Sequence, residues 1–101
     1  MAEADVTGDR ILVAEDEPDM RSLIVMMLEA EGFEAVEAAD GEAALANAQR
    51  DKPDLILLDV MMPKMDGFEV CRRLRSDLDT STTPIILLSA KASLDDTVAG
   101  L

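Results

Sequence analysis

The most informative part of the sequence is Pro53-Asp-Leu-Ile-Leu-Leu-Asp-Val-Met-Met-Pro-Lys-Met-Asp-Gly67. Its apolar run Leu55–Leu58 is typical of a strand that is buried on both faces at the centre of a parallel sheet. Asp59 follows directly, and an unpaired acidic side chain at the end of such a strand costs several kcal/mol, so something must stabilise it. Asp66 and Gly67 then predict the start of a helix.

Three further apolar runs predict strands. Ile11–Ala14 is bounded by charged residues, and Pro84–Leu88 follows a polar loop at 77–83. The run Phe33–Ala38 contains two glutamates, so we expect it at an edge of the sheet. Between the strands, Pro18, Asp40 and Asp66 mark helix starts, and Gly32 marks a helix end.

The apolar residues of these helices repeat at helical spacing and predict packed faces. In the first helix the face consists of Met20, Leu23, Ile24, Met27 and Leu28, and in the third we expect Phe68, Cys71 and Leu74 to point inward. We expect most of the seven methionines in the core and a last helix beginning at Ser93.

This alternation predicts the α/β class, a doubly wound parallel sheet with helices on both faces and right-handed crossovers. With 101 residues the chain forms one domain, for which we expect a tail at 1–9 and a folded part at 10–101. In such sheets ligands bind at the carboxyl ends of the strands.

Composition excludes several classes of function. The net charge of −13 and the near absence of aromatic residues argue against direct binding of nucleic acid. No apolar run approaches the length of a membrane span, and we expect no membrane partner. Without histidine there is no His-based catalysis or metal site, and the single cysteine, Cys71, favours a reducing compartment, the cytoplasm.

Acidic side chains follow two strands that we expect to be neighbours. Glu15 and Asp16 come after the first strand and Asp59 after the third, while Ser89 follows the fourth. Clustered carboxylates repel one another unless a cation intervenes, and a site with oxygen ligands favours Mg²⁺ or Mn²⁺. An aspartate beside such an ion can act as a nucleophile toward phosphorus, and a hydroxyl can bind a phosphoryl oxygen.

Each residue also has a plainer interpretation. Asp16 alone could interact with the dipole at a helix N-terminus. Ser89 alone is most often a strand-end residue. Lys91 alone is most often solvated, and Cys71 on an apolar helix face is most often core.

Together, four segments make the chain resemble the receiver domain of two-component response regulators. They are Ile11–Pro18, Ala39–Leu45, the stretch Pro53–Gly67 and Pro84–Lys91, in the same order and spacing. The resemblance runs from Arg10 to Leu101 and implies a flavodoxin-like sheet with strand order 2-1-3-4.

The resemblance also implies a role for each site residue. Asp59 is similar to the phospho-acceptor and Ser89 to the switch hydroxyl. The metal ligands would be Asp16, Glu15 through water or more distant contacts, Asp59 itself and the backbone carbonyl of Met61. The implied cofactor is Mg²⁺ (or Mn²⁺), and the implied partner is a histidine kinase or a phosphotransfer protein.

The sequence departs from that family after its fourth strand. Receivers continue with a fifth strand and helix that carry an invariant lysine, and Lys91 does not match that lysine. We therefore expect Ile85–Leu88 to form an open sheet edge. Three explanations of this departure are open. The chain is a fragment of a longer protein, or a second copy or another chain completes the sheet edge, or the chain is an engineered half of a receiver domain.

Three functions are compatible with these features. The first is a receiver module in phosphorelay signalling that is phosphorylated on Asp59 without being a turnover enzyme. The second is a non-phosphorylated dimerisation or docking module that uses the fourth strand. The third is a small aspartyl phosphatase, which usually needs a second acidic residue where this chain has Met61.

Overall fold

The computed structural model describes residues 9–88, and these fold around one parallel sheet. The strands are β1 (Arg10–Ala14), β2 (Glu34–Ala38), β3 (Leu55–Asp59) and β4 (Ile85–Leu88), and the helices are α2 (Pro18–Ala30), α3 (Gly41–Asp51) and α4 (Gly67–Arg75). The strand order is β2-β1-β3-β4, with every neighbouring pair parallel. The predicted fold class and strand order are confirmed. The helix expected at Ser93 lies outside the described residues.

Local signals set the helix starts. Pro18 begins α2, and the side chain of Glu17 accepts a hydrogen bond from the Met20 N–H. Asp40 and Asp66 cap α3 and α4 in the same way. These caps satisfy N–H groups that have no partner within the helix. Two of the three, Asp40 and Asp66, are the caps that the sequence predicted.

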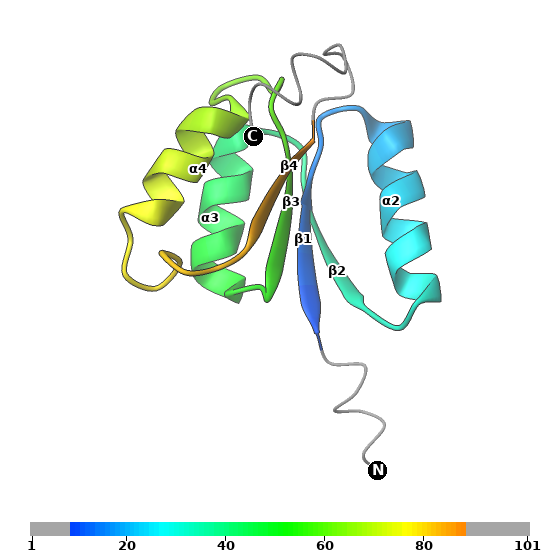
Figure 1. The fold of residues 1–101 in the computed structure, drawn as a ribbon. Coiled ribbons are helices and arrows are strands. Elements are labelled where there is room, and N and C mark those ends of the chain that lie inside the picture. The colour runs from blue at the N-terminus through cyan, green and yellow to red at the C-terminus, as the bar shows by residue number, and fades with distance from the viewer. Residues whose placement is uncertain (1–8, 89–101) are drawn as a thin grey trace.

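The main core lies between the sheet and the pair α3 and α4 (Figure 1). Two small side chains of α3, Ala44 and Ala48, let that helix approach the sheet closely. The fully buried larger side chains come from β1, β3 and α4, and they are Leu12, Ile56, Leu58, Val70 and Leu74. Cys71 packs at its margin, partly buried, as the sequence predicted.

Among residues 9–88, only helix α2 covers the other face, and it lies along β1 and β2 (Figure 1). None of its residues is fully buried. Met20, Leu23 and Met27 are 40%, 50% and 60% exposed, so much of the predicted apolar face of this helix is uncovered. The half-buried residues of α2, which face the sheet, are Arg21, Ile24, Val25 and Leu28. The stripe of Met20, Leu23 and Met27 then lies on the opposite flank of α2.

Two expectations about burial are wrong. Phe68 does not point inward but is 56% exposed, because its helix α4 turns Val70 and Leu74 to the core instead. The methionines are not mostly core either, since Met62 is buried whereas Met26 and Met61 are largely exposed. Among residues 9–88, no helix has the length and apolar character needed to cross a membrane.

Candidate functional site

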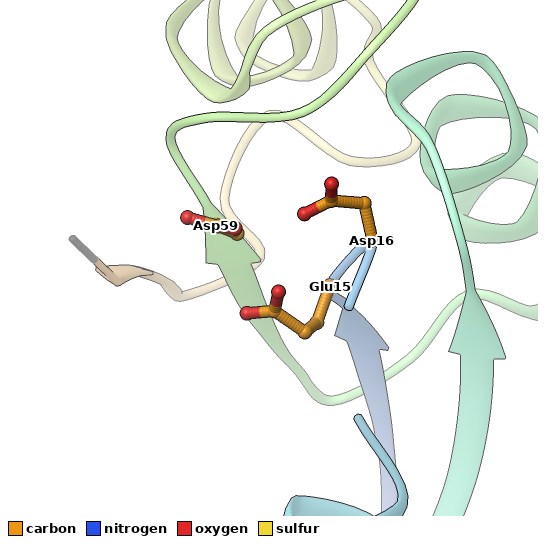
Figure 2. A group of neighbouring side chains, drawn as sticks. All are labelled: Glu15, Asp16 and Asp59. Carbon is orange, nitrogen blue, oxygen red and sulfur yellow. The ribbon is translucent and has the colours of Figure 1, made fainter. Parts of the chain in front are cut away.

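The acidic residues meet at one end of the sheet because β1 and β3 are adjacent. Ala14 pairs with Leu58, so the residues that follow the two strands lie beside each other. One carboxylate oxygen from each of Glu15, Asp16 and Asp59 lies within 4.8 Å of the other two. Figure 2 shows the three side chains at this end, two from the segment after β1 and one from the tip of β3. The predicted convergence of the carboxylates is thus present in the structure.

Backbone contacts fix Glu15 on both sides. Its N–H donates to the Ala38 carbonyl at 3.1 Å, and its own carbonyl accepts from Arg21 Nη1 at 2.9 Å. The carboxylate accepts from the Glu17 N–H at 3.1 Å and is buried. The orientation of this side chain therefore depends on α2 and β2 as well as on β1.

Asp59 is 5% exposed at the end of β3. Its Oδ1 accepts from the Met61 N–H at 3.2 Å, which turns the following loop back toward the carboxylate. Gly67 closes that loop, since its N–H donates to the Val60 carbonyl at 2.9 Å. A Cβ at Gly67 would lie 2.5 Å from the Asp59 carbonyl oxygen, so a side chain cannot fit there without a shift of the backbone.

The electrostatics of the cluster are unbalanced. Burial raises the pKa of Glu15, and the negative charges of Asp59 and Asp16 raise it further, whereas the hydrogen bond from the Glu17 backbone opposes the shift. Among residues 9–88, no ion pair involves any of the three carboxylates. The structure therefore has a concentrated negative charge without a basic partner in the part of the chain that it describes.

A hard divalent cation fits this donor set. All three side chains offer oxygen, two of them are buried, and neither histidine nor a thiolate is among the donors. Mg²⁺ and Mn²⁺ prefer such ligands, and Mg²⁺ keeps several water molecules when one or two carboxylates hold it. Glu15, Asp16 and Asp59 are the residues that would hold the ion.

The other predicted site residues have different outcomes. Met61 is held beside Asp59 by its N–H, and the role of its carbonyl stays a prediction. Ser89 lies outside the described residues, so its predicted role as a hydroxyl donor is untested.

Sequence reasoning missed two residues that shape the site. Arg21 donates a hydrogen bond to the Glu15 carbonyl. The feature of the sequence that could have indicated this contact is a single basic residue on the helix that follows the acidic segment. Gly41 lets the loop after β3 pass close to the start of α3, because a Cβ at this position would clash with the Met65 carbonyl oxygen. The Asp-Gly pair at 40–41 was interpreted only as a helix start.

Comparison with known proteins agrees with this geometry. The family described as "Response regulator receiver domain" matches residues 11–101. The chain is 42% identical over 97 residues to the DNA-binding response regulator MtrA of Mycolicibacterium smegmatis, covering 96% of this chain and 41% of that protein. It is 41% identical over 101 residues to the probable transcriptional regulatory protein TcrX of Mycobacterium tuberculosis, covering all of this chain and 42% of that protein. The chain thus spans about two fifths of these relatives.

Solved structures give the same result. The chemotaxis protein CheY4 of Vibrio cholerae superposes with a TM-score of 0.81 at 35% identity, covering 91% of this chain and 77% of that one. The receiver domain of the sensor histidine kinase PA1611 of Pseudomonas aeruginosa superposes with a TM-score of 0.82 at 36% identity, covering 88% and 73%. That structure has a magnesium ion coordinated in its active-site cleft. By sequence and by fold, this chain belongs to the receiver domain family of the response regulators of two-component signalling.

Proposed function

We propose that the chain accepts a phosphoryl group on Asp59 with Mg²⁺ as cofactor. One observation carries this proposal: three carboxylates from the adjacent β1 and β3 ends lie within 4.8 Å of one another, and two of them are buried. A purely structural site would pair such charges with basic side chains, because unpaired buried charge is costly. A site for a cation and a phosphoryl group accounts for the arrangement.

The chemistry follows from the charges. A carboxylate oxygen of Asp59 attacks the phosphorus of a phosphohistidine, a P–O bond forms and the P–N bond breaks. The departing imidazole nitrogen takes up a proton, and Asp59 becomes an acyl phosphate. When bound, a divalent cation would supply positive charge that offsets the negative phosphoryl oxygens. Glu15 and Asp16 would hold the cation. The Met61 N–H, which donates to Asp59 Oδ1, would orient the attacking carboxylate. The hydroxyl of Ser89, which lies outside the described residues, is predicted to donate to a phosphoryl oxygen.

The partner in this proposal is a histidine kinase or a phosphotransfer protein in the cytoplasm. The chain takes one phosphoryl group per cycle and is not a turnover enzyme, apart from gain and loss of its own phosphoryl group. The family match and the acidic cluster support this assignment. The single free cysteine agrees with a reducing compartment.

Intact-mass spectrometry after incubation with Mg²⁺ and acetyl phosphate tests the proposal. We expect a gain of one phosphoryl group that hydroxylamine removes, and no gain in the Asp59→Asn variant. Asp54→Asn is the matched control at the opposite end of β3, because asparagine still accepts the hydrogen bond that Asp54 takes from the Arg10 N–H. No uptake by the folded parent chain, or equal uptake by Asp59→Asn, would contradict the proposal.

A second candidate function is a docking or dimerisation module that needs no phosphoryl group. The observation that favours it is the position of β4 at the edge of the described sheet. Light scattering over a range of concentrations tests it, since a monomer throughout would leave this function without support.

A further inference from the structure

Two of the three carboxylates of the site stand on one short acidic segment. Glu15, Asp16 and Glu17 are consecutive, and they join the end of β1 to the start of α2. Adjacent negative charges repel one another, so the shape of this segment depends on contacts that hold it. Between residues 11 and 49 the sequence has a single basic side chain, Arg21, four residues after Glu17.

Hydrogen bonds fix the peptide groups before Glu15 and after Asp16. The Glu15 N–H belongs to the first of these groups, and it donates to the Ala38 carbonyl at 3.1 Å. The Glu17 N–H belongs to the second, and it donates to the Glu15 carboxylate at 3.1 Å. Because a peptide group is planar, each bond fixes the direction of the backbone on its side.

The peptide group between Glu15 and Asp16 is held by a side chain of α2. Its carbonyl, that of Glu15, accepts a hydrogen bond from Arg21 Nη1 at 2.9 Å. Hydrogen bonds from a charged donor are stronger than those between neutral groups. The Asp16 N–H lies in the same plane as this carbonyl, so the bond helps to set the directions in which both acidic side chains leave the backbone.

A second contact holds the guanidinium group of Arg21. Its Nε donates to Glu37 Oε1 at 3.1 Å, which ties α2 to β2. The Arg21 side chain is only 19% exposed, so this group is well enclosed. A guanidinium is planar and has several donors in fixed directions, and it therefore serves both acceptors at once. The acidic segment, α2 and β2 are connected through one rigid group.

We propose that Arg21 is a positioning residue for the cation site, which holds Glu15 and Asp16 in the arrangement that binds Mg²⁺. This inference rests on the proposed function, because it concerns the same Mg²⁺ site. Arg21 acts through the Glu15 carbonyl, and its positive charge excludes it from the ligands of a cation. Groups that orient metal ligands typically contribute about 10- to 100-fold to metal affinity.

The charge of Arg21 and its hydrogen bond predict opposite effects on Mg²⁺ affinity. A positive charge beside the acidic segment disfavours a bound cation. Arg21→Met keeps the apolar stem of the side chain, and it would strengthen Mg²⁺ binding if charge alone mattered. If Arg21 positions the ligands, the same change weakens Mg²⁺ binding. The sign of the change in Kd therefore separates the two roles.

Titration calorimetry with Mg²⁺ measures that sign. We expect the Kd of Arg21→Met to rise about tenfold, with circular dichroism confirming that the variant is folded. Arg21→Lys should bind Mg²⁺ more tightly than Arg21→Met, because an ammonium group still donates to the Glu15 carbonyl. Arg50→Met is the matched control, since it removes the same charge from the last turn of α3. Its Kd should change by less than about twofold, because salt screens an exposed and distant charge.

The possible results distinguish this inference from the proposed function. If the parent binds Mg²⁺ and Arg21→Met binds it equally or more tightly, the positioning role is overturned while the cation site stands. The role is also overturned if Arg21→Lys binds no better than Arg21→Met, or if Arg50→Met loses as much affinity. A parent chain that binds no Mg²⁺ would overturn the cation site and this inference together. Arg21→Ala, with a strong helix former, gives the same test if Arg21→Met does not fold.

Discussion

Replacing Asp59 by asparagine should make the protein more stable when no divalent cation is present. The variant keeps the size of the side chain and an oxygen that can accept the Met61 N–H. It removes one of three negative charges whose oxygens lie within 4.8 Å of one another. A residue that is retained at a cost to stability is expected when it binds something that the folded chain alone does not supply.

The size of the effect follows from Coulomb's law. Two unit charges at 4.8 Å repel by about 0.9 kcal/mol in water and by about 3.5 kcal/mol at an effective dielectric constant of about 20. Asp59 takes part in two such pairs, one with Glu15 and one with Asp16. We expect a gain of about 1–3 kcal/mol in the free energy of unfolding, or a rise in Tm of roughly 4–8 °C per kcal/mol for a domain of this size.

Thermal unfolding at neutral pH, with EDTA and then with Mg²⁺, measures both halves of this prediction. In EDTA the variant should melt above the parent. With Mg²⁺ at about 100 times its Kd, the parent should gain about 2.7 kcal/mol. The variant should gain much less, because it has lost one of the three carboxylates.

A variant with the same change of net charge separates the cluster from the overall acidity of the chain. Glu29→Gln removes one negative charge from the exposed surface of α2 and should change the stability by no more than about 0.5 kcal/mol. If Asp59→Asn destabilises the protein in EDTA, or if its Mg²⁺ response equals that of the parent, the three carboxylates do not form a shared cation site.

Three further predictions concern the surroundings of the site. Gly67→Ala should lower the free energy of unfolding in urea by about 1–3 kcal/mol, because its Cβ would lie 2.5 Å from the Asp59 carbonyl oxygen. It should also weaken Mg²⁺ binding in titration calorimetry, and an unchanged Mg²⁺ affinity would show that this loop does not shape the site. Thr80→Val should cost about 1–3 kcal/mol in the same unfolding assay, since the buried hydroxyl donates to the Leu74 carbonyl at 2.7 Å; a neutral result would mean that the hydroxyl contributes nothing to this loop. Because the pKa of Glu15 is raised, the folded state retains a proton over a pH range in which the unfolded state has lost it. In EDTA, the stability that this proton contributes is therefore present at acid pH. It is lost as the pH rises through the pKa of the folded state. The lowered pKa values of Asp40, Asp51 and Glu69 act in the opposite sense, so the contribution of Glu15 is the difference in unfolding free energy between the parent and Glu15→Gln. Urea unfolding should show that this difference declines from acid to neutral pH, and a difference that does not change with pH would contradict the prediction.

The sequence predicted the sheet well because its signals are local. Four apolar runs and the capping residues Asp40 and Asp66 were enough to place the strands and helix starts within about one residue. The acidic site followed by topology, since parallel neighbours bring the ends of β1 and β3 together. Strand order itself came from the family resemblance, because apolar runs alone do not specify which strands are neighbours.

Burial was harder to predict because it depends on what lies opposite each side chain. The periodicity of α2 correctly indicated a helix, but it does not say how much of the apolar face a neighbour covers. The position of α2 over β1 and β2 decides that, and this position is a tertiary property. The predicted burial of Phe68 was wrong for the same reason, since Val70 and Leu74 already fill the core side of α4. Steric needs such as those of Gly41 and Gly67 appear only when two distant segments meet.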